Sequence, residues 1–193
     1  MANMATQIKE PKETRYSKHG GKITIPLAPD DLTFIEGMTT GDFKKKKHRS
    51  YAVLLYYTAI RESEGLRCVP ENFQISKDAV VFDAGKRLKH GKTTPPLLIP
   101  RAACFVDELI NDIQATKRKE RIWPYCRKTG YNIVDRAFGF YPHFFRLSRI
   151  TNFFLEGWTI PQVKSWTGLT LTALEYYVGT VDIINMGKSL KHS

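Results

Sequence analysis

The chain has 193 residues, enough for one well-buried domain and too few for two of ordinary size. Thirty Lys and Arg residues against nineteen Asp and Glu residues give a formal net charge of +11, while 42% of the residues are hydrophobic. A charge of this size indicates a polyanionic partner. The basic residues are spread along the chain and do not form one amphipathic helix, which favours nucleic acid over a membrane surface.

Three cysteines, Cys68, Cys104 and Cys126, are widely spaced and follow no metal-ligand pattern. They indicate reduced thiols in an intracellular protein and exclude a zinc site of the usual spacing. No apolar run approaches the ~20 residues needed to span a bilayer, and the chain does not open on a secretory signal pattern. We therefore expect a cytoplasmic protein that has no contact with membrane.

The first 25 residues are polar and basic and show no hydrophobic period, which predicts a flexible arm. Residues 26–181 form the predicted single domain, and residues 182–193 a C-terminal tail that contacts a neighbouring subunit. A helix is predicted to begin near Asp30, which has a side chain suited to an N-cap. Residues 47–62 are apolar on more than one face and predict a buried helix. Arg61 is expected at its C-terminal end, where the helix dipole favours a cation.

Residues 79–82 are rich in β-branched and aromatic side chains and predict a strand. Residues 95–100 predict a second strand, and their prolines confine it to the edge of a sheet. The two strands form a hairpin with a lysine-rich tip. Helices are predicted over 102–115 and 131–138, from Pro142 to Gly157, over 160–168 and from 170 to 177. The predicted fold is mostly α with a small β-hairpin or three-stranded antiparallel sheet.

Three short motifs carry chemical meaning. They are Thr58-Ala59-Ile60-Arg61-Glu62-Ser63-Glu64, then His143 and Arg146 one helical turn apart, then the pair Tyr176-Tyr177. Cationic donors that converge on a phenol suit attack on a phosphodiester, because negative charge develops on the phosphate.

These motifs, in this order and with a lysine-bearing hairpin between them, resemble the catalytic domain of the tyrosine recombinases or integrases, particularly archaeal and phage-type members. The first motif is similar to the family's Thr-Gly-Leu-Arg-x-Ser-Glu, and the resemblance covers about residues 26 to 181. It implies an α+β catalytic fold and a site-specific DNA recombinase that cuts and rejoins strands.

The resemblance also implies roles for single residues. Arg61 and Arg146 would clamp the scissile phosphate, because a guanidinium donates two parallel hydrogen bonds. His143 would donate a hydrogen bond or a proton there, and Glu64 would tether Arg61 or a nearby backbone group. Tyr177 would attack and form a 3′-phosphotyrosyl bond, with Tyr176 as the alternative nucleophile. The covalent bond conserves the phosphodiester energy, so we expect neither metal, ATP nor another cofactor.

A lysine at the hairpin tip would protonate the departing 5′-oxygen. The amino-acid sequence around the tip resembles family members in which the lysine at the position of Lys89 is catalytic, and Lys86 and Lys92 are the alternatives. The basic clusters would bind the DNA backbone, each neutralised phosphate steepening the salt dependence of binding. The residues assigned to that contact are Lys44, Lys45, Lys46, Lys47, Arg49, Arg87, Lys117, Arg118, Lys119 and Arg121.

The chain departs from the family pattern in two places. The family has a His or a Trp about nine residues before the tyrosine, where this chain has Leu169; Trp166 either supplies the indole from one turn away or belongs to the core. Only about 25 polar residues stand where the family has a helical core-binding domain.

The expected partners are double-stranded DNA and further copies of the chain, as a dimer or tetramer. Two alternatives stay open: a non-catalytic DNA-binding regulator or decayed integrase, and a DNA-relaxing enzyme of the type IB topoisomerase kind.

Overall fold

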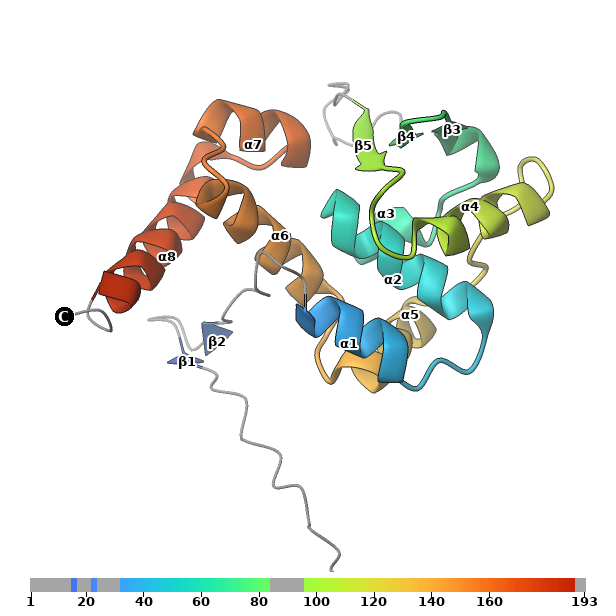
Figure 1. Cartoon of the computed structure of the whole chain (residues 1–193), viewed down its shortest axis with the longest axis horizontal. Coiled ribbons are helices and arrows are strands. Elements are labelled where there is room, and N and C mark those ends of the chain that lie inside the picture. Colours follow the sequence, from blue (N-terminus) through green and yellow to red (C-terminus); the bar gives the residue numbers. More distant parts are fainter. Residues whose placement is uncertain (1–14, 17–21, 24–31, 84–95, 190–193) are drawn as a thin grey trace, which may run out of the picture.

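The computed structural model describes residues 15–16, 22–23, 32–83 and 96–189 (Figure 1). It is mostly helical with a three-stranded antiparallel sheet, which confirms the predicted fold class. The described elements are β1 (Arg15–Tyr16), β2 (Lys22–Ile23), α1 (Leu32–Thr40), α2 (Lys46–Thr58), α3 (Glu62–Gly65), the 3-10 turn η1 (Pro70–Asn72), β3 (Phe73–Ile75), β4 (Ala79–Phe82), β5 (Leu97–Pro100), α4 (Val106–Ala115), α5 (Arg127–Phe138), α6 (His143–Leu155), α7 (Ile160–Thr167) and α8 (Leu171–Ser189).

Helix α6 connects two groups of elements (Figure 1). On one side lie α1 to α5 and the sheet, which share a large hydrophobic core with the first turn of α6. On the other side lie α7 and α8, which pack on the rest of α6. The apolar contacts of that second group define the C-terminal cluster, made of Ala59, Ile150, Phe153, Val163, Leu174 and Tyr177. The predicted nucleophile is therefore part of a hydrophobic core.

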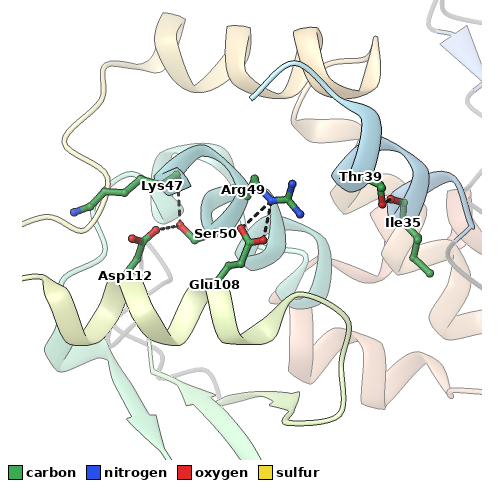
Figure 2. Close-up of polar contacts among 7 residues, drawn as sticks. All are labelled: Ile35, Thr39, Lys47, Arg49, Ser50, Glu108 and Asp112. Carbon is green, nitrogen blue, oxygen red and sulfur yellow. Dashed lines mark hydrogen bonds and ion pairs between the residues drawn. The ribbon is translucent and has the colours of Figure 1, made fainter. Parts of the chain in front are cut away.

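Helix α2 runs through the middle of the large core, as its apolar sequence predicts. Tyr51, Val53 and Leu54 have no exposed surface, and burial of this kind stabilises a fold by roughly 1.5 to 3 kcal/mol per side chain. Polar contacts fix α4 along it (Figure 2). There the Ser50 hydroxyl lies between the Lys47 carbonyl and the Asp112 carboxylate, and Arg49 Nε donates to both oxygens of Glu108, at 2.8 and 2.9 Å.

The end of α2 corrects the expectation for Arg61. The helix stops at Thr58 because Ala59 adopts left-handed backbone angles, with φ 54° and ψ 23°. Arg61 is instead the N-cap residue of the short helix α3. The prediction that Arg61 ends the buried helix, in the favourable field of its C-terminus, is therefore wrong.

Ala59 provides a stability prediction. A left-handed conformation strains every residue with a Cβ, most of all a β-branched one, and Ala59 is also fully buried. The Ala59→Val variant should lose about 2 to 4 kcal/mol of unfolding free energy through strain and overpacking. Ala59→Gly should change it far less, because glycine adopts these angles freely. Urea denaturation of both variants checks this; equal losses would contradict the role assigned to the backbone angle.

The sheet has the order β3-β4-β5, with β4 in the centre. β4 covers the predicted strand 79–82, and the proline-flanked β5 lies at the edge, so both predictions are confirmed. The antiparallel pairing of Phe82 with Leu97 brings the two strands together at the point where the predicted hairpin tip begins. The tip itself lies outside the described residues.

Other helix boundaries differ from the predictions. α4 begins at Val106 and not near Ala102, because Phe105 has a positive φ of 63°. α5 begins at Arg127, four residues before the predicted start, and α8 continues to Ser189, well past Tyr177. Two residues of β1 pair with two of β2 inside the predicted flexible arm. Within the part of the chain that the structure describes, no helix is both long and apolar enough to cross a membrane.

Candidate active site

Arg146 is the most deeply buried charged residue at the predicted site. It lies on α6, only 2% of its surface is exposed, and its guanidinium donates to two main-chain carbonyls. Nη1 donates to the carbonyl of Ala59, and Nη2 donates to that of Thr167 at 3.0 Å. Both carbonyls belong to helix C-termini, whose last carbonyl groups have no partner within the helix. Arg146 thus joins the ends of α2 and α7.

Trp166 makes a parallel contact from α7. Its indole Nε1 donates to the carbonyl of Thr58 at 3.2 Å, one residue before the carbonyl that Arg146 binds. The ring packs against Phe153 and Trp158, with ring centroids 5.5 Å apart in both cases. Of the two alternatives for Trp166, this placement fits the core residue, because its indole N–H points at protein backbone.

We expect the Trp166→Phe variant to lose about 1 to 3 kcal/mol of unfolding free energy, because the fully buried Thr58 would keep a carbonyl without its donor. Trp158→Phe is the matched control, since it replaces an indole of the same cluster by the smaller phenyl ring and leaves the Trp166–Thr58 hydrogen bond in place. Chemical denaturation should show the larger loss for Trp166→Phe. The reverse order would mean that ring packing, and not the hydrogen bond, carries the stability.

Arg61 and Glu64 form a closed pair at the start of α3. Glu64 Oε2 accepts from the Arg61 backbone N at 2.8 Å, and its Oε1 accepts from Arg61 Nη1 at 3.1 Å. Glu64 therefore holds both the backbone and the guanidinium of Arg61, the two contacts that the sequence suggested as alternatives. Almost half of the Arg61 side chain is exposed, so part of its guanidinium faces solvent.

Tyr177 and Tyr176 have opposite environments. Tyr177 is 8% exposed and lies in the C-terminal cluster, whereas Tyr176 is 51% exposed. Their rings meet edge to face, 5.8 Å apart. Burial raises the pKa of the Tyr177 phenol above its ordinary value, the Arg146 charge acts against this rise, and Tyr176 and Tyr141 add to it. The phenol is thus neutral at pH 7. The positive charge that acts on it is the Arg146 guanidinium.

His143 begins α6, next to both arginines. Part of the His143 residue is exposed, yet neighbouring protein removes enough hydration to lower its pKa, and the charges of Arg146 and Arg61 lower it further. The imidazole is therefore mostly neutral at pH 7, with one N–H to donate. Arg146 is thus the shared neighbour of this group: its charge acts on both His143 and Tyr177, and Arg61 acts on His143.

An NMR titration should give His143 a pKa below 6.5, and Arg61→Ala should move it upward, because one repelling charge is gone. Since the folded-state pKa is lowered, the unfolded chain takes up this proton first as the pH falls below 6.5. His143 therefore destabilises the fold in acid. A His143 pKa that is unchanged by Arg61→Ala would place the two residues in separate environments.

The predicted DNA-binding residues fall into three groups. Lys44, Lys45, Lys117, Arg118, Lys119 and Arg121 are exposed. Lys47 and Arg49 are half-buried and make internal contacts: Lys47 Nζ donates to Thr116 Oγ1 at 3.3 Å, and Arg49 is paired with Glu108. Arg87 and the side chain of Lys46 lie outside the described residues, as do Lys86, Lys89 and Lys92, the candidates for the general acid. The general acid thus stays a prediction.

Comparison with known proteins identifies the fold. No family model matches the chain, and no curated protein does. Among solved structures, the fold is similar to that of a tyrosine recombinase. The XerH site-specific recombinase bound to palindromic difH substrate, in a post-cleavage complex, has a TM-score of 0.68 and 16% identity over 92% of this chain. A pre-cleavage complex of XerH bound to difH substrate has a TM-score of 0.61 and 15% identity over 84% of this chain. The chain spans 56% of the length of each XerH chain. The chain therefore has the tyrosine recombinase fold.

Sequence reasoning missed several groups that build this site. The carbonyls of Thr58, Ala59 and Thr167 hold Trp166 and Arg146, and no sequence pattern marks a backbone acceptor of this kind. Tyr141 influences Tyr177 electrostatically, and its position two residues before His143 was the available signal.

Proposed function

We propose that this protein cuts and rejoins DNA strands through a covalent tyrosine intermediate, as a site-specific recombinase or integrase. The observation that carries the proposal is the arrangement around Tyr177. The buried Arg146 guanidinium acts on the Tyr177 phenol, and it also acts, together with the partly exposed Arg61, on the His143 imidazole, on the tyrosine recombinase fold.

In the proposed reaction the Tyr177 oxygen attacks the phosphorus of the scissile phosphodiester. The phenolic proton passes to a water molecule, a 3′-phosphotyrosyl bond forms, and the bond to the 5′-oxygen breaks. Lys89 donates a proton to that oxygen, so a 5′-hydroxyl is released. Arg61 and Arg146 stabilise the charge on the non-bridging oxygens, and His143 donates a further hydrogen bond. A 5′-hydroxyl from another strand reverses these steps and reseals the DNA.

The arrangement explains how a weak acid becomes a nucleophile here. Burial keeps the proton on Tyr177 in the free protein, and Arg146 is the positive charge that acts against this effect. A guanidinium needs no metal to polarise a phosphate, so the proposed reaction uses no cofactor. Double-stranded DNA is the proposed partner, contacted by the exposed basic residues. The proposed acting form is a dimer or tetramer on DNA, with residues 182–193 contacting the next subunit.

A nicked duplex tests the proposal, because cleavage next to the nick releases a short strand and traps the covalent intermediate. A target sequence must first be selected from random duplexes that the protein retains at moderate salt. The expected result is a protein–DNA adduct that survives denaturant and is digested by protease to a peptide bearing phosphotyrosine. Specific binding without any adduct, on every nicked form of the selected site, would overturn the proposed chemistry.

One observation favours a second candidate, a DNA-binding protein on the same fold that no longer cleaves. Tyr177 is buried among apolar side chains, and the indole of Trp166 is bound to the Thr58 carbonyl. Such a protein would keep its sequence-specific binding and its salt dependence and would form no adduct. The nicked-duplex assay separates the two candidates, and plasmid relaxation without strand exchange would indicate a topoisomerase activity.

A further inference from the structure

Arg61 depends on a very short helix for its position. α3 has four residues, Glu62 to Gly65, so its own backbone hydrogen bonds hold it weakly. The two bonds between Glu64 and Arg61 lie within the first turn of α3. The direction in which Arg61 points must therefore be fixed by contacts between α3 and its neighbours.

Two glycines let the Tyr51 side chain reach α3 and α5 from α2. A methyl group placed on Gly65 would lie 3.3 Å from Tyr51 Cε2, and one placed on Gly130 would lie 3.1 Å from Tyr51 Oη and 3.0 Å from Glu62 Oε1. The bare backbone of Gly130 thus gives space to a phenol oxygen and a carboxylate oxygen at the same point. On the outer side, Glu62 Oε2 accepts from Arg127 Nε at 3.3 Å.

These two oxygens are chemically complementary and otherwise unsatisfied. In the described part of the chain, Tyr51 Oη and Glu62 Oε1 are both buried and have no hydrogen-bond partner. Buried polar groups are nearly always hydrogen-bonded to protein or to ordered water. One group is a donor and the other an acceptor. Burial raises the pKa of Glu62, and burial followed by the Glu62 charge raises that of Tyr51, so both groups are in a poorly solvated environment.

We propose that Glu62 is a positioning residue for Arg61, held by the Tyr51 hydroxyl through one ordered water molecule that bonds to both oxygens. The Tyr51–Glu62 pair fixes α3 on α2 and α5, and thereby fixes the N-cap at which Arg61 stands. This inference rests on the proposed function, in which Arg61 binds the scissile phosphate.

The test measures the single-turnover rate of adduct formation at saturating nicked DNA, together with the Kd for uncut DNA, in folded variants. Tyr51→Phe and Glu62→Ala should each slow cleavage about 10- to 100-fold, the effect of misplacing a catalytic group by about 1 Å, with little change in Kd. Glu62→Gln should restore most of the rate, because its amide oxygen can still accept a hydrogen bond from the bridging water. Glu156→Ala is the matched control, since it breaks the Arg149–Glu156 pair at 2.8 Å in another part of the fold.

A double variant measures whether the two residues act as one unit. Tyr51→Phe combined with Glu62→Ala should cleave no more slowly than Glu62→Ala alone. The inference would be overturned if the double variant were slower than Glu62→Ala alone, or if neither single change lowered the cleavage rate.

If the unaltered protein forms no adduct, the proposed function fails on its own. The NMR resonance of Arg61 Nε then becomes the readout. A shift of that resonance in Tyr51→Phe and Glu62→Ala but not in Glu156→Ala would still support positioning, and no shift would refute it.

Discussion

Replacing Tyr177 with phenylalanine should abolish the covalent adduct with nicked DNA, whereas Tyr176→Phe should leave it intact. Tyr177 lies in the C-terminal cluster, where the Arg146 charge acts on it, whereas about half of the Tyr176 surface is exposed. Without the phenol oxygen no phosphotyrosyl bond can form, so the loss should exceed about 10,000-fold, the limit of an adduct assay. Both variants should fold, because phenylalanine keeps the ring contacts.

Denaturing gels of the two variants on the selected site give the measurement. DNA binding by Tyr177→Phe should stay within about threefold of the original, which shows that the defect is chemical. An adduct that persists in Tyr177→Phe but disappears in Tyr176→Phe would move the nucleophile to Tyr176. An adduct that survives both single changes would exclude this pair as the source of the bond.

The second large effect is expected at Arg146, where one substitution should damage both stability and chemistry. Arg146→Ala leaves the carbonyls of Ala59 and Thr167 without their donor, which should cost about 2 to 6 kcal/mol of unfolding free energy. It also removes the buried charge beside Tyr177. Loss of a preorganised donor slows such reactions about 100- to 1,000-fold, and a charged one more. Denaturation and single-turnover cleavage at low temperature measure the two effects separately.

Arg149→Ala is the matched control for Arg146. It lies on the same helix, pairs with Glu156 at 2.8 Å and stacks 4.5 Å from the centre of the Phe153 ring. It should cost stability and leave the cleavage rate of the folded protein within a few-fold. If Arg149→Ala slowed cleavage as much as Arg146→Ala, the loss in both would reflect general loosening of α6.

The periodic parts of this fold could be read from the sequence because burial imposes the period. Tyr51 to Leu55 are apolar on all sides and form the centre of the core, and Ala79–Phe82 alternates as a strand with one buried face. The boundaries set by positive φ at Ala59 and Phe105 could not be read, because neither residue is a glycine or asparagine that signals such a turn. Tertiary packing fixed those two angles.

The candidate site likewise has residues that could be predicted from the sequence and contacts that could not. Arg61, His143, Arg146 and Tyr177 could be chosen from motif order, and in the structure the Arg146 charge acts on both His143 and Tyr177. What Arg146 binds could not be predicted, since its partners are carbonyls 87 and 21 residues away in sequence. The same holds for the meeting of the Tyr51 and Glu62 oxygens beside Gly130, which brings residues of three helices to one point.

The double attachment of Arg146 changes what its presence in a sequence means. A lineage that gave up cleaving DNA would still need this arginine, because the ends of α2 and α7 are fastened to each other through it. Selection for folding alone would preserve it. Among the described residues, Arg61 is nearly half exposed and its guanidinium pairs with Glu64 of its own turn, so it fastens no two helices together. Among chains of this kind, drift at the Arg61 position should therefore be the earlier mark of lost catalysis, and retention of Arg146 by itself should not be taken as a mark of activity.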